Sequence, residues 1–133
     1  MKSDEKLLTE LTQATDGLLF MSESDYPFEP VRWPDQTELT PDAVRRLTGS
    51  DESAPIETQS VNDFFRPAAT EADWKNAQQL AAARRYQALV GWLQDNLADV
   101  RVYRIGRIQI DVYIVGRSAA GSWIGLKTRV IET

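Results

Sequence analysis

Apolar and polar positions recur along this chain with two different periods, and the change between them divides it into two parts. Up to about residue 97 the apolar side chains lie mainly three or four residues apart, as on one face of a helix. From Val100 onward they alternate with other residues, which is typical of strands. One face would carry Ile108, Ile110, Val112 and Ile114, and the other Gln109, Asp111, Tyr113 and Val115. Helices followed by strands predict an α+β sandwich.

Two short helices are expected before residue 50. The first spans residues 4–15, where leucines and alanine lie at helical spacing, and Gly17 supplies a stop just after it. The second begins with Thr40 as N-cap and Pro41 as a favoured first residue. It should cover residues 41–47 and end near Gly49.

The longest helix is predicted from a capping motif to about Leu97. Thr70 and Asp73 have the spacing of a capping box, with Asp in place of the preferred Glu. The run that follows is rich in alanine and glutamine, which favour helix. Its buried stripe would contain Ala77, Ala81, Leu89, Leu93 and Leu97, widened by Tyr86, Val90 and Trp92.

The remaining segments predict strands and one buried turn. Prolines around Val31 and Trp33 favour an extended edge strand. Residues 56–61 alternate well enough for a strand, and residues 61–65 should then turn and bury the adjacent Phe64 and Phe65. Turn residues divide the last part of the chain into an antiparallel meander of residues 101–105, 108–115 and 122–131.

Composition narrows the class of protein. With 133 residues, 42% hydrophobic and 26% charged, we expect one globular domain over residues 1–133. No segment has the length of a membrane span, and acids near the N-terminus are unlike a signal peptide, so we expect a cytoplasmic protein. We also expect it to be a monomer when free. Cysteine and histidine are absent, which removes the thiolate nucleophile, the commonest general base and ordinary zinc ligand sets. We therefore expect no enzyme.

Charge is distributed unevenly. The net charge is −5, with −9 in residues 1–99 and +4 in residues 100–133. Such a chain repels nucleic acid as a whole, and its acidic part favours a basic protein partner, although net charge of this size also serves solubility alone. Neither a glycine-rich phosphate loop nor an aromatic and basic RNA-binding motif occurs.

Residues 16–29, DGLLFMSESDYPFE, are typical of a contact loop, because a solvated linker would not place Met21, Tyr26 and Phe28 among acids. Here the chain resembles the nuclease A inhibitor family. The similarity continues in order through VNDFF (61–65), ADW (72–74), VYRIG (102–106), DVYIVG (111–116) and VIET (130–133). The resemblance implies a central, mainly antiparallel sheet with helices on both faces. It also implies a protein that binds and blocks the active site of a sugar-nonspecific, metal-dependent endonuclease, without a cofactor of its own.

Candidate contact residues follow from the matched motifs. Glu23 stands between two serines and could be a solvated loop acid, but the matching glutamate of the family meets a water held by the metal of the nuclease. Thr133, the last residue, could be a frayed end, whereas the matching threonine of the family approaches that magnesium directly, in the complex only. Asp25 adds a further negative charge beside Glu23.

Asp73 and Trp74 are the other candidates. In the first turn of the predicted long helix, Asp73 could act as a cap, and Trp74 could be buried or could anchor an interface. The matching pair in the family contacts the partner. Two alternatives stay open: an acidic protein-binding adaptor with a different basic partner, and a carboxylate-based hydrolase built from acids such as Glu23, Asp25 and Asp111.

Overall fold

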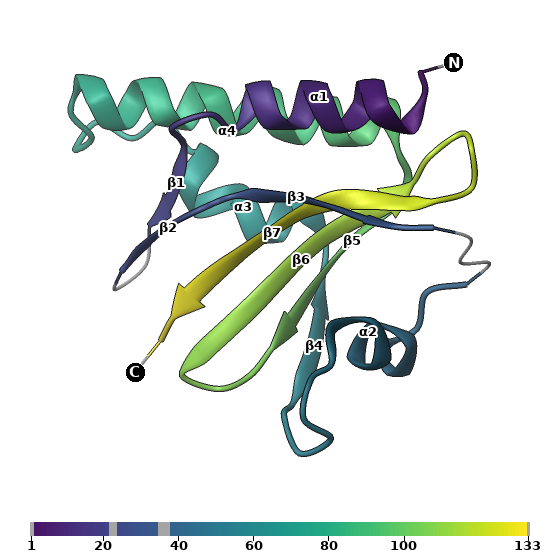
Figure 1. Cartoon of the computed structure of the whole chain (residues 1–133). Helices are drawn as coiled ribbons and strands as arrows, with labels where there is room; N and C mark the ends of the chain where they lie inside the picture. Colours follow the sequence, from purple (N-terminus) through teal and green to yellow (C-terminus); the bar gives the residue numbers. More distant parts are fainter. Residues whose placement is uncertain (1, 22–23, 35–37, 133) are drawn as a thin grey trace.

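The computed structural model describes residues 2–21, 24–34 and 38–132 (Figure 1). Its helices are α1 (Asp4–Ala14), α2 (Pro41–Thr48), α3 (Val61–Ala69) and α4 (Ala77–Asn96). Its strands are β1 (Leu19–Met21), β2 (Asp25–Pro27), β3 (Glu29–Trp33), β4 (Ile56–Gln59), β5 (Ala98–Ile105), β6 (Gln109–Arg117) and β7 (Trp123–Ile131). The first two helices and the last three strands lie within a few residues of their predicted positions.

In the part of the chain that the structure describes, five strands form an antiparallel sheet in the order β3-β7-β6-β5-β4. Since β5, β6 and β7 are neighbours both in the chain and in the sheet, the predicted meander is confirmed. β3 lies at one edge of the sheet, which confirms the edge strand around Val31 and Trp33. Pro30 is tolerated there because an edge strand is paired on one side only, so a residue without an N–H need not break a ladder hydrogen bond. β1 and β2 form a separate antiparallel hairpin.

Helices cover both faces of the sheet, as Figure 1 shows. On one face α1, α3 and α4 enclose a core that includes Leu11, Phe65 and Leu93, each 0% exposed. On the other face Val44 of α2 packs with Tyr103. Alternation along β6 supplies both cores: Ile110, Val112 and Ile114 belong to the first, and Tyr113 and Val115 to the second. The predicted α+β sandwich is therefore confirmed.

Residues 61–65 form the start of α3, so the predicted turn is wrong. The hydroxyl of Ser60 accepts a hydrogen bond from the backbone N–H of Asp63 at 3.1 Å, which caps the helix and ends β4 before Ser60. The overlooked signal is the Ser-x-x-Asp spacing ahead of apolar residues. The predicted burial of Phe64 and Phe65 is nevertheless confirmed, since both side chains of α3 are buried in the core.

The start of α4 also differs from the prediction. Asn76 is the N-cap: its side chain accepts from the backbone N–H of Gln79 at 2.8 Å, and the Gln79 side chain accepts from the backbone N–H of Asn76 at 2.9 Å. This reciprocal capping box satisfies two backbone donors and outcompetes the weaker Thr70-x-x-Asp73 spacing. Thr70 instead follows the last turn of α3 as its C-cap. The capping role considered for Asp73 is therefore wrong.

Three apolar residues assigned to a shared or buried face are exposed. Ala77 and Ala81 lie on the first turns of α4, and Ile108, which precedes β6, is 59% exposed. Farther along α4 the predicted burial of Leu89 and Leu93 is confirmed. Ala77 and Ala81 are exposed because only the later turns of α4 lie over the buried core formed by the sheet, α1 and α3. Ile108 lies before the first residue of β6.

Candidate protein-binding site

The α3–α4 link (residues 70–76) carries Asp73 and Trp74 outside any helix, which corrects their predicted place in a first helical turn. Although it has no regular structure, the link is held in place by its own side chains. The ammonium group of Lys75 donates a hydrogen bond to the carbonyl oxygen of Pro67 at 3.1 Å, and so ties the link to the last turn of α3.

A second set of contacts ties the same link to α4. Nε of Arg84 lies 2.9 Å from Oε1 of Glu71, and the Gln87 side chain donates to the carbonyl oxygen of Ala69 at 2.7 Å. The hydrogen bond from Arg84 lowers the pKa of Glu71, so this carboxylate stays ionised at neutral pH. The backbone around Trp74 is therefore fixed from both helices.

Trp74 projects from this fixed link into solvent. Its side chain is 77% exposed, the largest exposed fraction among the large hydrophobic residues described. The only ring contact described for it is with the ammonium group of Lys75, 5.5 Å from the ring centroid. The neighbouring Asp73 is exposed as well. An ordered but uncovered indole is typical of an anchor for a partner, because it offers a large apolar area at little entropic cost.

The β1–β2 hairpin stands below the link in Figure 1 and is anchored by aromatic residues. Phe20 of β1 stacks on Phe64 at 4.7 Å between ring centroids and meets the edges of Phe65 and Tyr86. Phe28, just after β2, completes this cluster. Phe28, which is buried, and Phe20, which is partly buried, therefore anchor residues 16–29 on the core.

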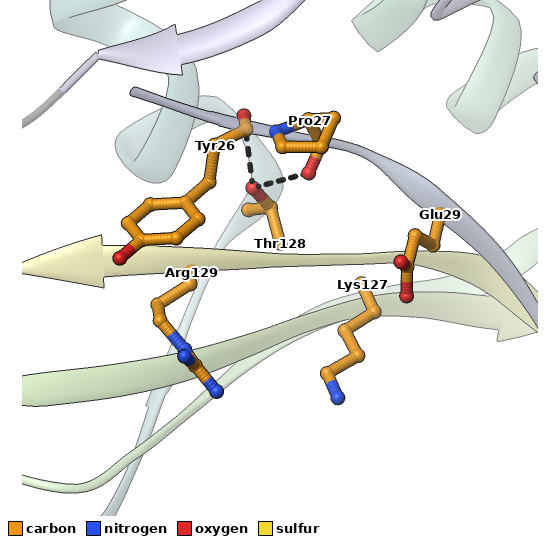
Figure 2. Close-up of a pocket in the computed structure, with 6 residues that line it drawn as sticks. All are labelled: Tyr26, Pro27, Glu29, Lys127, Thr128 and Arg129. Carbon is orange, nitrogen blue, oxygen red and sulfur yellow. Dashed lines mark hydrogen bonds between the residues drawn. The ribbon is translucent and has the colours of Figure 1, made fainter. Parts of the chain in front are cut away.

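The hairpin is also fixed to the end of β7 (Figure 2). The hydroxyl of Thr128, a buried side chain, donates to the carbonyl oxygen of Pro27 at 3.0 Å. Beside it, the Arg129 guanidinium lies 5.7 Å from the ring centroid of Tyr26, and its Nε lies 3.1 Å from Oδ1 of Asp111. These contacts line a shallow pocket of about 250 Å³ between β2 and β7. β2 therefore has a fixed position beside β7.

The structure brings part of the predicted site together. Asp25 lies exposed on β2 and lines a groove that also includes Asn76, the cap of α4. Because Trp74 precedes that cap by two residues, Asp25 and the α3–α4 link lie on the same side of the molecule. The other two predicted contact residues, Glu23 and Thr133, lie outside the described residues.

Several residues of this region were not found by sequence reasoning. Thr128 and Arg129 fix the hairpin through contacts between distant parts of the chain, for which a single sequence carries no signal. Asp111, considered for a hydrolase, is paired with Arg129 instead. Within residues 2–21, 24–34 and 38–132, no group of three or more acids, histidines or cysteines is arranged to hold a metal ion. No helix described there is both long and apolar enough to cross a membrane.

Comparison with known proteins identifies the family. The model of the nuclease A inhibitor-like protein family matches residues 5–133, nearly the whole chain. The chain therefore belongs to this family, and the resemblance seen in its motifs is confirmed. A search of curated proteins finds no match. An inhibitor family implies a nuclease as partner and a protein that acts by inhibition.

Proposed function

We propose that this nuclease A inhibitor-like protein binds a sugar-nonspecific, metal-dependent endonuclease and blocks its active site. The observation that carries the proposal is Trp74, an indole 77% exposed on a link that an ion pair and hydrogen bonds hold in place. Burying such a side chain gains free energy only when a partner covers it. Family membership identifies the class of that partner.

The acids near this edge support binding to a basic, metal-containing cleft. Asp25 and Asp73 are exposed, and a nuclease that binds phosphate presents positive charge around its metal. By resemblance to the family, the Glu23 carboxylate would meet a water on the magnesium of the nuclease. Oxygens of Thr133 would approach that ion directly, as a hard cation prefers. The inhibitor contributes no catalysis and no metal of its own.

The test is protection of plasmid DNA and of RNA from a purified magnesium-dependent endonuclease of the nuclease A type, titrated with the full chain. Glu23→Ala and a chain lacking Thr133 test the two contacts nearest the metal. Glu52→Ala, an exposed acid in the loop after α2, is the matched control for loss of one negative charge. We expect protection at a one-to-one ratio, weakened by the first two changes and unaffected by the third.

Other results separate the proposal from its rivals. Protection that neither Glu23→Ala nor loss of Thr133 weakens would retain inhibition and reject these two contacts. Absence of protection against a panel of such nucleases would reject the proposed function and favour an adaptor for another basic protein. Cleavage of either substrate by the purified chain alone would instead show an enzyme.

A further inference from the structure

The largest of the described grooves lies between the first turns of α4 and the β1–β2 hairpin. Its volume is about 500 Å³. One wall is helical, with amide and small side chains, and the other comes from the segment that leads into β1 and from Asp25 of β2. The lining residues used below are Leu19, Asp25, Asn76, Gln78, Ala81 and Arg85. This is the part of α4 whose alanines were expected to be buried and are exposed.

The walls of the groove are fixed by hydrogen bonds between α4 and the segment after α1. Nη2 of Arg85 donates to the carbonyl oxygens of Ala14 and Asp16, each at 2.9 Å, at the end of α1. This cation satisfies carbonyl groups that α1 leaves unpaired. The hydroxyl of Tyr86 donates to the carbonyl oxygen of Leu19 and so ties β1 to α4. The groove therefore exists before any partner binds.

The charged side chains around the groove differ in whether they already have hydrogen-bond partners within the chain. Lys75, Arg84 and Arg85 all donate to carbonyl or carboxylate oxygens of this chain. By contrast, the carboxylates of Asp25 and Asp73 form no hydrogen bond or ion pair with any residue that the structure describes. Carbonyl groups leave the positive charges of Lys75 and Arg85 in place, so the surface as a whole is not negative. Asp25 and Asp73 are its carboxylates without a described partner, and the complement of each is a positive group.

Apolar side chains flank the same groove. Leu19, in its lining, is 44% exposed, and Trp74 stands two residues before the Asn76 cap. The groove is thus continuous with the surface proposed above to meet the nuclease. We propose that it receives a segment of the nuclease with a basic side chain directed toward Asp25 and an apolar neighbour on Leu19. This inference rests on the proposed function and extends the interface beyond the active site.

The decisive variants are Ala81→Arg and Ala81→Glu, at an exposed lining position of α4. Both new residues favour helix, so the fold should be unaffected. Arginine would fill the groove and repel a basic segment, whereas glutamate would fill it but attract that segment. Ala88→Arg is the matched control, because Ala88 is exposed on the same face two turns farther along, outside the groove lining.

The readout is the dissociation constant of the complex with the same nuclease, at low and physiological salt, together with the melting temperature of each free variant. We expect Ala81→Arg to weaken binding at least about tenfold, Ala81→Glu to weaken it clearly less, and Ala88→Arg to change it less than about twofold. Equal binding by wild type and Ala81→Arg would overturn the proposed role of the groove in binding and leave the inhibitor function intact. Equal losses of affinity in Ala81→Arg and Ala81→Glu would overturn the proposal that the bound segment is basic. Failure of the wild type to bind would overturn the proposed function and this inference with it.

Discussion

Two sets of aromatic residues lie close to the β1–β2 hairpin and differ in what covers them. Phe20 of the hairpin packs ring against ring on Phe64, Phe65 and Tyr86, which belong to the larger core. By contrast, Trp74 lies 77% exposed on a link that is held in place. The rings of the first set are covered by one another and by other residues of the same chain. Trp74 has only the Lys75 ammonium group described beside its ring and is otherwise exposed. The difference predicts that the first set serves stability and that Trp74 serves the proposed binding.

The largest effect is expected in the buried set. Phe65→Ala should lower the free energy of unfolding by about 3–5 kcal/mol, because Phe65 is 0% exposed and its removal leaves a cavity. Thermal or urea unfolding measures this change. Phe65→Leu, which keeps most of the volume, should cost clearly less and provides a folded variant. If folded Phe65→Leu inhibits nuclease like the wild type at equal concentration, the buried set has no direct part in binding. Loss of inhibition without loss of stability would contradict the comparison.

The reverse result is expected for Trp74→Ala. Stability should change by less than about 0.5 kcal/mol, since little of the indole is buried. Binding to the nuclease should weaken by roughly 2–4 kcal/mol, which corresponds to about 30- to 1000-fold in the dissociation constant. Calorimetric titration and a melting curve on one preparation measure both quantities. A variant that binds normally would remove Trp74 from the interface, whereas one that melts well below the wild type would show that Trp74 also serves stability.

The sequence predicted the fold better than it predicted the site. The meander follows from alternation along residues 108–115, which is a local signal, and so does the helix that Thr40 and Gly49 delimit. The start of α4 was misplaced because two capping motifs compete within a few residues, and only their actual hydrogen bonds decide between them. Trp74 was named as a possible interface anchor through the family motif, but its place on a link before α4 was missed.

No local sequence pattern predicted the groove or the hydrogen bonds that hold the neighbouring segments in place. Arg85 reaches carbonyl oxygens at the end of α1, about seventy positions earlier in the chain, and Thr128 reaches Pro27 from the last strand. Contacts of this range depend on the completed fold, and side-chain spacing does not encode them. Resemblance to a family supplied the candidate residues, but not the walls of the groove that one of them, Asp25, lines.

An intermediate effect is expected where the stable and the binding regions meet. Thr128→Val keeps the shape of a buried side chain and removes the hydrogen bond to Pro27, at a cost of about 1 kcal/mol. Because this bond holds β2 against β7, the amides of β1 and β2 should exchange faster with solvent and inhibition should weaken modestly. Thr58→Val on the opposite edge strand is the control. Unchanged exchange in the hairpin would show that aromatic packing alone holds it.

The smallest effect is expected at a second tryptophan, which has an internal partner. Nε1 of Trp92 donates to Oε1 of Glu10 at 2.9 Å, and Nζ of Lys2 lies 2.7 Å from the same oxygen. The hydrogen bonds from Lys2 and Trp92 lower the pKa of Glu10 below its ordinary value of 4.5. A carboxylate with a lowered folded-state pKa stabilises the fold fully above the unfolded value and loses this contribution as pH falls through the folded one.

Glu10→Gln isolates this contribution, since glutamine can still accept from the indole but carries no charge. We expect a slightly lower melting temperature than wild type at pH 7, and convergence of the two curves as pH falls below 4.5 toward the folded-state pKa of Glu10. Inhibition at pH 7 should stay unchanged, because Trp92 is partly buried against α1 and lies away from the groove. A difference in melting temperature that persists at low pH would mean that packing, not charge, is what Glu10 contributes. The same measurement on Trp74→Ala should show no pH dependence of its own, because the Trp74 indole has no carboxylate partner among the described residues.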